Sequence, residues 1–582
     1  MIHLLKLKQA GFSELAYQFA QLIYRLSKSD DQLVAITAAL LSEAMSQGNM
    51  CLNLKQTNTE NHILSNDLPE QSADWINHLK HSHLVGETGE YKPLILTEDG
   101  LLYVYRYWQD EQTIARGLQQ RLAPLNNIDL SQMHADFANW QSHQPDQIDW
   151  QKVAVFMALT RQFCIISGGP GTGKTTIVLR LLQLLNKQNP KLNITLAAPT
   201  GKAAARLQQA VFQADNPYEA KTLHRLLGIS EHKEQGRYNS QNPLPIDVLI
   251  IDEASMIDSS LMALLLSALP QHARLILLGD SQQLASVESG SILSNLCQNP
   301  NQFSAEFAQS LATTTAIKLP VLDSNANTSN LVDSVVALQH SYRFDEHSQI
   351  GQLACAVQSG NIQAVYNVLT DELWQSQCNN AAIQKQVLAG YQAYFEAVHQ
   401  HQDPIACLDL FERYRVLCAL KQGPQSVTAV NQLIERFLQS KGWRTQQAFY
   451  HGRPIMIGKN DYQQGLFNGD TGLILQNSSG QLHGYFLIDN IIKQVAINRL
   501  PAHDTAFAIT IHKSQGSEFD NISILLPEED SPLLNRELLY TAITRSKNSL
   551  MLICTDLCLT KTVEQQHQRE SGLAKLMTSS AL

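Results

Sequence analysis

One stretch decides the fold of this 582-residue chain: Gly168-Gly169-Pro170-Gly171-Thr172-Gly173-Lys174-Thr175, or GGPGTGKT. The apolar run Phe163–Ile166 precedes it, and a helical pattern follows it. Glycines let backbone N–H groups curl around phosphate oxygens without interference from a Cβ. We therefore expect this phosphate-binding loop to hold a nucleotide, with Lys174 reaching the β- and γ-phosphates and the Thr175 hydroxyl binding Mg²⁺.

Apolar runs recur along the rest of the chain, each followed by turn residues and a helical pattern. The first series is Phe163–Ile166, Ile194–Ala198, Val248–Ile251 and Leu275–Leu278. The second series is Arg415–Leu420, Ala506–Ile511, Ile522–Leu526 and Leu550–Cys554. Continuous short runs of this kind are typical of strands buried on both faces. They predict an α/β fold with two parallel sheets covered by helices.

The same patterns predict the domain organisation. Residues 1–110 form a helical and mixed N-terminal domain, which starts with the helical segment Phe12–Met45. Residues 111–340 and 341–582 each hold one parallel sheet, and a polar loop, Thr313–Asn330, lies near the end of the first. Within the second, residues 452–500 are rich in glycine and short alternating strands, which predicts a small inserted β-barrel.

Composition limits the class of protein and its partners. A hydrophobic content of 44% is that of a soluble globular protein, and the net charge of −10 confines any nucleic-acid contact to a local groove or a shared surface. The nine cysteines include no C-x-x-C pair, so we expect reduced thiols. The N-terminus lacks a signal-peptide pattern, and no apolar run reaches the roughly 18–20 residues that span a bilayer. We expect a cytoplasmic protein.

Two adjacent acids, Asp252 and Glu253, follow the apolar run Val248–Ile251. A strand of an open α/β sheet delivers such side chains to the edge where ligands bind. We expect Asp252 to hold Mg²⁺, and Glu253 to orient and deprotonate an attacking water. Two acids here could instead only cap the next helix.

Two glutamines are further candidates at this site. Gln283 lies in a polar turn directly after the run Leu275–Leu278, where an amide can report the loss of the γ-phosphate. Gln151 lies on a predicted helix, Asp149–Leu159, and its amide offers both a donor and an acceptor to the edge of adenine. Either side chain could instead be an ordinary polar surface residue.

Two arginines are candidates for completing the site from the opposite domain. They are Arg343, in Gln339-His340-Ser341-Tyr342-Arg343-Phe344, and Arg545, in Tyr540-Thr541-Ala542-Ile543-Thr544-Arg545. An arginine inserted at a phosphoryl-transfer site stabilises the negative charge that spreads in the transition state. The alternative for each is a surface salt bridge.

A third group of residues suits sequence-independent contacts to the phosphates of a nucleic-acid strand. These residues are Pro199, Thr200, Gly201, Lys202, Thr222, His224, Thr510, His512 and Lys513. The segment that holds the last three continues to Glu518, which could reach the ribose of the nucleotide. The full set expected to bind the nucleotide is Gln151, Gly168, Gly169, Pro170, Gly171, Thr172, Gly173, Lys174, Thr175, Thr176 and Glu518.

In this order, the motifs resemble those of superfamily-one DNA helicases and, within them, the RecD family, the α subunits of bacterial exodeoxyribonuclease V (RecBCD). The narrower match rests on four details: Tyr105-Arg106-Tyr107-Trp108, Asn242-Pro243-Leu244, Asp252–Asp258 and Asn460–Gly472. The resemblance covers roughly residues 95–555. It implies two RecA-like P-loop motor domains and an SH3-like barrel as the insertion.

The resemblance also implies an activity and partners. These are ATP- and Mg²⁺-dependent 5′→3′ translocation on single-stranded DNA, unwinding at double-strand breaks for recombinational repair and degradation, and assembly with RecB and RecC. In the family the N-terminal domain docks on RecC and the barrel helps to hold DNA. Because the sequence shows no nuclease cluster of carboxylates and lysine, the resemblance places the nuclease on RecB. Ile229–Gln241, where stand-alone relatives carry a strand-separating hairpin, is short and polar.

Three other functions remain open from the residues alone. The chain could be a stand-alone RecD-like helicase, or a nucleotide-driven switch or scaffold that does not move along DNA. The strand-contact residues argue against the switch. An RNA motor is also compatible, because phosphate contacts do not distinguish the sugars unless 2′-hydroxyls are read.

Overall fold

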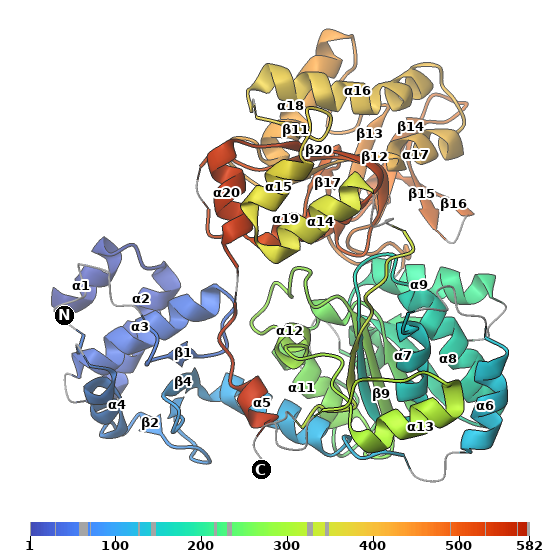
Figure 1. Ribbon diagram of the computed structural model, residues 1–582. Coiled ribbons are helices and arrows are strands. Elements are labelled where there is room, and N and C mark those ends of the chain that lie inside the picture. Colours follow the sequence, from blue (N-terminus) through green and yellow to red (C-terminus); the bar gives the residue numbers. More distant parts are fainter. Residues whose placement is uncertain are drawn as a thin grey trace.

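In a computed structural model of the protein, three bodies lie side by side (Figure 1). The structure describes residues 2–28, 31–57, 68–69, 71–125, 129–140, 147–214, 218–229, 236–322, 330–343, 348–376, 378–461, 463–488, 491–529, 531–566 and 568–578. Two of the bodies are built around parallel sheets, here the first and second sheets, and the third is an N-terminal unit. Within these described residues, no helix is long and apolar enough to cross a membrane.

The first sheet has six parallel strands in the order β10-β5-β9-β8-β6-β7. They are β5 (Phe163–Ser167), β6 (Ile194–Ala198), β7 (Ala220–Thr222), β8 (Val248–Ile251), β9 (Arg274–Gly279) and β10 (Val335–Ala337). Successive side chains enter two separate buried clusters: Ile165 and Leu249 lie in one, Ile166 and Ile250 in the other. The prediction of a parallel sheet buried on both faces is confirmed.

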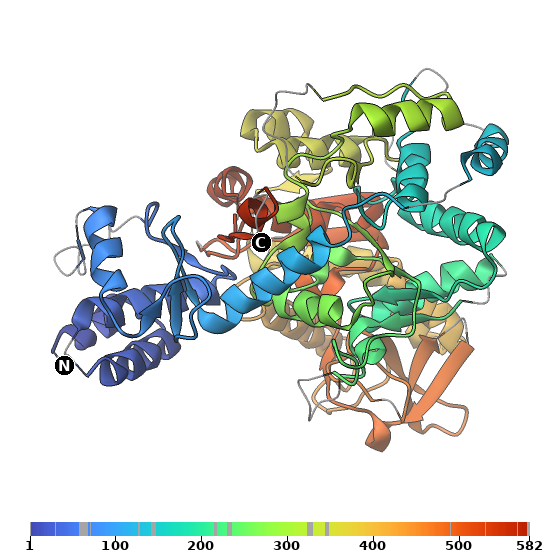
Figure 2. The same cartoon turned by 90° about the horizontal axis from the view of Figure 1, so that it is seen from below.

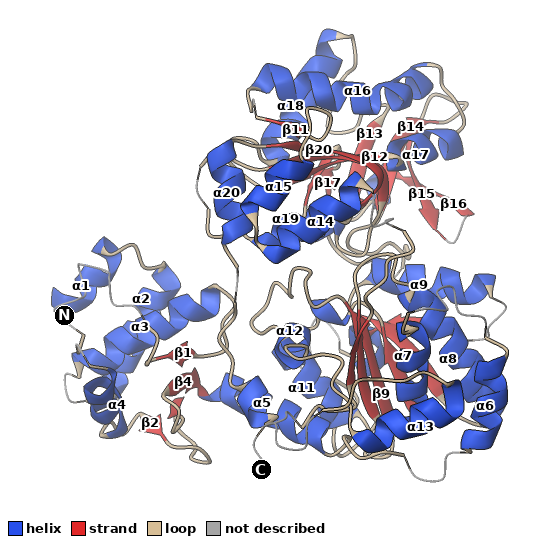
Figure 3. Ribbon diagram, in the orientation of Figure 1, coloured by secondary structure: helices blue, strands red, loops and turns tan. Residues whose placement is uncertain are grey.

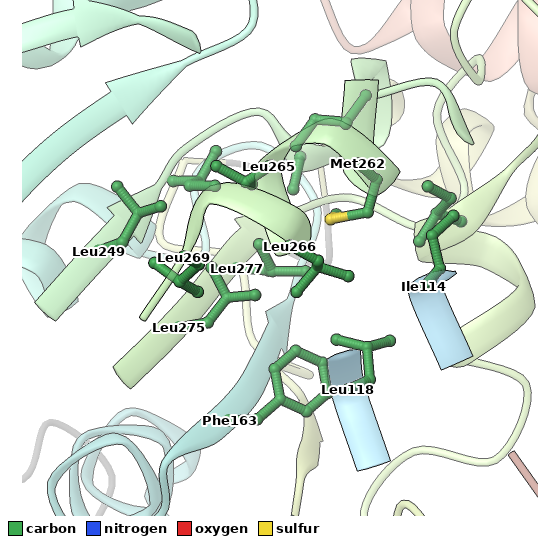
Figure 4. Close-up of a cluster of buried hydrophobic side chains, with 14 of the residues drawn as sticks. Ile114, Leu118, Phe163, Leu249, Met262, Leu265, Leu266, Leu269, Leu275 and Leu277 are labelled. Atoms are coloured by element: carbon green, nitrogen blue, oxygen red, sulfur yellow. The ribbon is translucent and has the colours of Figure 1, made fainter. Parts of the chain in front are cut away.

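Helices cover both faces of this sheet (Figure 3). They are α6 (Leu130–Ala138), α7 (Trp150–Thr160), α8 (Lys174–Gln188), α9 (Gly201–Gln213), α10 (Leu223–Leu227), η2 (Ala254–Met256), α11 (Ser259–Ala268), α12 (Ile292–Leu296) and α13 (Ala305–Thr315). One more helix, α5 (Tyr105–Gln119), crosses the expected boundary at residue 110. Its Ile114 and Leu118 pack into the same cluster as Leu266 of α11 (Figure 4).

The second sheet has five parallel strands in the order β11-β20-β19-β12-β18. They are β11 (Trp374–Gln375), β12 (Tyr414–Cys418), β18 (Ala508–Thr510), β19 (Phe519–Leu525) and β20 (Ser546–Ile553). Around them lie α14 (Gln349–Ser359), α15 (Ile362–Val368), α16 (Asn380–His399), α17 (Pro404–Glu412), α18 (Val427–Ser440), η4 (His512–Ser514), α19 (Arg536–Ile543) and α20 (Asp556–Glu564).

The expected insertion in the second sheet is a separate antiparallel sheet in the order β16-β15-β14-β13-β17. Its elements are β13 (Arg453–Ile457), β14 (Thr471–Gln476), β15 (Leu482–Ile488), β16 (Ile491–Ala496), η3 (Ile497–Arg499) and β17 (His503–Thr505). Within the described residues, the edge strands β16 and β17 do not pair with each other. Closure into an SH3-like barrel therefore stays a prediction.

The N-terminal unit combines helices with a small sheet in the order β1-β4-β3-β2. Its elements are α1 (Ile2–Gln9), α2 (Glu14–Leu26), α3 (Gln32–Ser46), β1 (Leu52–Asn53), α4 (Ser72–Lys80), β2 (Val85–Gly86), β3 (Leu94–Leu96) and β4 (Leu101–Val104). The helical segment expected at residues 12–45 is two helices. Ser13 and Asp31 each accept a hydrogen bond from a backbone N–H three residues later, so each begins a new helix.

After α20 the chain leaves the second sheet and returns to the first (Figures 1 and 2). Residues 569–578, the C-terminal segment, contain the short helix α21 (Leu573–Leu576). Leu573 and Met577 are buried in the hydrophobic cluster that also contains Leu118 of α5 and Leu266 of α11. Gln119 of α5 donates to the Leu576 carbonyl over 2.9 Å. The polar sequence before this segment gives no hint of that return.

Two expectations reach partly outside the described residues. Of the polar loop expected at residues 313–330, residues 313–315 are instead the last turn of α13, and residues 323–329 are not described. Of the segment 229–241, residues 230–235 are not described, so the structure does not bear on a strand-separating hairpin there.

Candidate functional site

A cavity of about 640 Å³ lies at the carboxyl edge of the first sheet, where it meets the second. Most of the predicted nucleotide residues line it. They are Gln151, Pro170, Gly171, Gly173, Lys174, Thr175, Thr176, Asp252, Glu253, Gln283, Arg343, Glu518 and Arg545. The structure thus brings together side chains that are widely separated in sequence.

The phosphate-binding loop joins β5 to α8 in the conformation that its glycines permit. Gly171 and Gly173 have φ angles of +80° and +86°, in the left-handed region that favours glycine. A Cβ at Gly173 would lie 2.2 Å from Nε2 of Gln151. The Lys174 ammonium donates to the carbonyls of Gly168, over 2.6 Å, and Gly169, over 3.1 Å. The lysine is therefore held over the loop.

Gln151 is buried and braces this loop. Its Nε2 donates to the Thr172 carbonyl over 3.0 Å. A second cavity, of about 360 Å³, is lined by Gln151, Thr172 and Tyr342, among others. Tyr342 also lines the first cavity, and its backbone N–H donates to the Gly171 carbonyl over 2.8 Å. Tyr342 had no predicted role, although an aromatic residue next to a candidate arginine is a usable signal in the sequence.

The acid pair lies where β8 ends. The Asp252 carboxylate accepts the N–H of Glu253 over 2.9 Å. Burial and the neighbouring Glu253 carboxylate raise the pKa of Asp252 to about 6, against the opposing effect of Lys174. Glu253 has a φ of +53°, which costs a residue with a side chain roughly 1–3 kcal/mol. The backbone turns sharply there, and both carboxylates line the cavity.

Gln283 is joined to the second sheet through Asp280. The Gln283 amide donates to Asp280 Oδ2 over 3.0 Å, and the Tyr540 hydroxyl donates to the same oxygen over 3.1 Å. Tyr540 belongs to α19, on the second sheet's side. Gln283, the expected nucleotide sensor, is therefore linked through the Asp280 carboxylate to Tyr540 on the side of the second sheet.

Arg545 reaches the cavity from the second sheet, between α19 and β20. It is 2% exposed; its Nε donates to the Thr541 carbonyl over 3.0 Å, and its Nη1 donates to the Ser517 carbonyl over 3.3 Å. Its buried Nη2 has no hydrogen-bond partner among the described residues. Burial lowers the pKa of Arg545, while Glu253 and Glu518 oppose that shift. A buried guanidinium nitrogen without a partner suits an anion in the cavity.

Arg343 approaches from a different direction than expected. It follows β10, the edge strand of the first sheet, and so lies in the connector to the second sheet. Its Nη1 is 2.8 Å from Oε1 of Glu518, which also pairs with Arg206 of α9. Burial alone would raise the pKa of Glu518, but the two arginines lower it. Arg206 was missed, although it lies one helical turn after Lys202.

The residues expected to contact a strand meet near the same seam. Thr222 pairs with Ala198, so it lies beside the segment from Pro199 to Lys202, and His224 follows on α10. From the second sheet, Thr510 ends β18, and His512 and Lys513 lie on η4. A Cβ at Gly516 would be 3.8 Å from that of Ala203, and one at Gly201 would be 3.0 Å from Phe467 Cβ.

Three of these threonines share one local geometry. The hydroxyl oxygens of Thr200, Thr222 and Thr510 each accept the N–H three residues later, at 3.2 Å. Each therefore caps a helical turn, which is a structural role. An accepting hydroxyl keeps its own proton for another acceptor, such as a phosphate oxygen.

The basic residues of the seam face carboxylates of the second half. Lys513 Nζ lies 3.6 Å from Oδ2 of Asp504. Burial lowers the pKa of Lys202, while the negative charge of Glu412 opposes that shift. Such pairing agrees with the acidic net charge, since the basic groups are local rather than spread over a surface.

Three family models match the chain. The model for the N-terminal domain of RecBCD enzyme subunit RecD matches residues 8–103, the AAA domain model matches residues 151–289, and the model for the UvrD-like helicase C-terminal domain matches residues 505–553.

Curated relatives match nearly the whole chain. RecBCD enzyme subunit RecD of Haemophilus influenzae is 35% identical, covering 96% of this chain and 97% of that protein. The subunit of the same name from Mycobacterium tuberculosis is 33% identical, covering 98% and 96%. The ATP-dependent RecD2 DNA helicase of Deinococcus radiodurans is 29% identical, covering 66% of this chain and 46% of that protein.

Proposed function

The chain belongs to the family of RecD subunits of the RecBCD enzyme, and from this premise we propose how it acts as an ATP-dependent DNA helicase subunit. One observation carries the proposal: a single cavity is lined by the phosphate-binding loop of the first sheet and by Arg545 of the second. A reaction that needs residues from both sheets proceeds only when the two halves of the molecule, one around each sheet, close on each other.

The residues then divide the work of hydrolysis. Lys174 binds the β- and γ-phosphates, and Glu253 orients and deprotonates the attacking water. Arg545 stabilises the charge that develops on the γ-phosphate, and its partnerless Nη2 supports that role. Arg343 adds a second positive charge from the connector, while its pairing with Glu518 keeps it at the cavity.

Thr175 and Asp252 are the residues that would hold Mg²⁺. The fit rests on geometry: the Asp252 and Glu253 carboxylates are adjacent and line the same cavity as Thr175, and the pKa of Asp252 is raised there. A hard divalent cation favours oxygen ligands and relieves that repulsion. When bound, it would neutralise charge on the phosphates.

The adenine is assigned to the smaller cavity, lined by Gln151 and Tyr342. A glutamine amide offers the donor and acceptor that the base edge needs, and an aromatic ring offers a stacking face. Glu518 lines the main cavity and pairs with Arg206 and Arg343, and we keep it as the candidate contact to the ribose.

We place the DNA strand along the seam marked by the three capping threonines, Lys202 and Lys513. These contacts hold phosphates and do not read bases, as translocation requires. Movement is assigned 5′→3′ on single-stranded DNA, starting at double-strand ends, as in the family. The work serves recombinational repair in the cytoplasm, and the nuclease activity of the complex belongs to RecB.

RecB and RecC are the proposed partners. The N-terminal unit offers a surface for one of them, because Leu15, Leu22 and Leu26 of α2 are exposed. An exposed apolar helix face is typical of a protein interface. Stand-alone action is disfavoured, since the RecD-specific N-terminal model matches and the RecD2 helicase is covered over less than half its length.

The test measures ATP hydrolysis and unwinding on DNA with 5′ or 3′ tails, for the chain alone and with RecB and RecC. We expect single-stranded DNA to stimulate hydrolysis, and unwinding to need a 5′ tail. A hydrolysis rate indifferent to DNA would favour the switch. Equal unwinding without partners would favour the stand-alone helicase.

A further inference from the structure

We call residues 282–290, which include Gln283, the sensor loop. This loop contacts the second sheet, the C-terminal segment and the N-terminal unit. Its near end is held by the second sheet: the Leu284 N–H donates to the Thr541 hydroxyl, and the Leu284 carbonyl accepts from Gln515 Nε2, both over 2.9 Å. A shift of the second sheet is therefore passed directly to the neighbour of Gln283.

The far end of the sensor loop is held by Arg569 of the C-terminal segment. Nη1 of Arg569 donates to the carbonyls of Glu288, over 2.8 Å, and Gly290, over 2.9 Å. Ser286 donates to the same two carbonyls from within the loop, over 3.0 and 3.2 Å. A charged donor shared by two carbonyls is a strong restraint on backbone.

Arg569 is itself placed by the N-terminal unit. The chain beside it pairs with that unit: Met50 N–H donates to the Glu570 carbonyl over 2.9 Å, and Glu570 N–H donates to the Asn49 side chain over 2.7 Å. Gly48 has a φ of +90°, and a Cβ there would lie 2.6 Å from Arg569 Cζ. The Gly290 N–H also donates to the Gly48 carbonyl over 2.9 Å.

We propose that Arg569 is a positioning residue for ATP hydrolysis, which acts by fixing the far end of the sensor loop so that Gln283 stays presented to the cavity. The inference rests on the function proposed above, because it concerns the same cavity. With its far end fixed, the loop turns a shift at Leu284 into a displacement of Gln283. Without Arg569, that end keeps its bonds to Gly48, Ser259 and Met45, and the loop absorbs more of the same shift.

Arg569 also acts electrostatically on one of the residues expected to contact a strand. Burial first, and then the positive charge of Arg569, lower the pKa of His512.

The first test replaces Arg569 in the full-length chain. We expect Arg569→Gln to lower the DNA-stimulated kcat about tenfold, less than the roughly hundredfold loss that a misplacement of about 1 Å can cause. The KM for ATP and the melting temperature should stay at their wild-type values. Arg569→Lys keeps a charged donor and should recover most of the rate. Lys575→Ala, on the same segment and 3.5 Å from Asp99, is the matched control.

The second test moves Arg569 without changing it. Gly48→Ala places a methyl group against the guanidinium, so it should reproduce the loss of kcat. Gly89→Ala is the control, because Gly89 also has a positive φ of +97° and no described atom lies within 4 Å of its Cβ position. Backbone strain is common to both variants, and only Gly48→Ala reaches Arg569.

The outcomes separate this inference from the proposed function. Wild-type chain that DNA does not stimulate would count against the helicase itself. Stimulated wild type with an unchanged kcat in Arg569→Gln, or equal rates in Gly48→Ala and Gly89→Ala, would overturn the role of Arg569 alone. A fall in melting temperature that Arg569→Lys does not reverse would also overturn it, since the residue would then be structural.

Discussion

The two parallel sheets share an architecture but differ in where they carry charge. In the first sheet, β5 is apolar through Ile166 and β8 through Ile251, and the cavity-lining loop and Asp252 follow them. In the second sheet, β12 buries Arg415 completely within the strand. The second sheet contributes to the cavity chiefly through Glu518 and Arg545, which lie just before β19 and β20.

This difference indicates a division of labour. Under the proposed function, the first sheet binds the triphosphate and supplies the base. The second sheet is stabilised internally by Arg415 and contributes Arg545 to the cavity. Four variants test that division, from the largest expected effect to the smallest.

Arg545→Ala tests whether the second sheet takes part in the chemistry. We expect kcat for ATP hydrolysis to fall about 10³-fold, because the guanidinium stabilises the transition state, with nucleotide affinity changed far less. Steady-state kinetics and nucleotide titration measure the two effects. Arg413→Ala, an exposed arginine in the same half, is the control. A kcat equal to that of the control would reduce Arg545 to a structural residue.

Glu253→Gln tests the base in the first sheet. Loss of proton abstraction should lower single-turnover hydrolysis roughly 10²–10³-fold while ATP still binds. Glu306→Gln on the exposed face of α13 should hydrolyse normally. Near-normal turnover in Glu253→Gln would transfer the role of base to another group.

Arg415→Met tests the bracing of the second sheet. Arg415 donates to the Ala506 carbonyl and to Glu412, each over 2.8 Å, and its Cζ lies 3.9 Å from the Phe411 ring centre. Its removal leaves the Ala506 carbonyl without its donor, while the Glu412 side chain is 40% exposed and keeps the Thr471 hydroxyl, so we expect a loss of about 2–3 kcal/mol in unfolding free energy. Urea denaturation of the variant and of Arg413→Met gives the comparison. Equal stability of the two would mean that the buried charge is dispensable.

Glu111→Gln tests the attachment of the C-terminal segment to α5, one of the helices that pack against the first sheet. Glu111 on α5 accepts from the Tyr103 hydroxyl over 2.9 Å, from the Ser571 hydroxyl, and from the Gly572 N–H over 3.1 Å. Burial raises the pKa of Glu111 from 4.5 to about 7.

A raised folded-state pKa gives stability that is present below pH 4.5 and is lost as the pH rises through about 7. The wild type should therefore lose up to about 3 kcal/mol relative to Glu111→Gln across this window. Denaturation at pH 5 and pH 8 measures the difference. Parallel pH profiles of the two proteins would show that Glu111 does not titrate there.

Local sequence predicted most of the first sheet's site. The phosphate-binding loop and the acid pair begin within two residues of an apolar run, and Gln283 lies in the turn after another, so one strand fixes the place of each at the edge. Arg545 was found because its flanking residues form a motif. These positions depend on a few neighbours in sequence, and pattern is enough for them.

Features made by distant residues escaped the sequence. The Arg206–Glu518 pair joins α9 to the segment before β19, and no periodicity signals it. β10 pairs with β5 at the far edge of the first sheet, which places Arg343 in the connector. The helix α5 spans the boundary drawn at residue 110, because its apolar face serves the sheet after it.

The return of residues 569–578 has a consequence for synthesis. Leu573 and Met577 complete a hydrophobic cluster whose other members, including Leu118 and Leu266, leave the ribosome hundreds of residues earlier. At about 5–20 residues per second, that cluster waits tens of seconds for its last side chains. The nascent chain therefore exposes an unfinished apolar surface while the second half is being made, and a holding chaperone would find its binding site there.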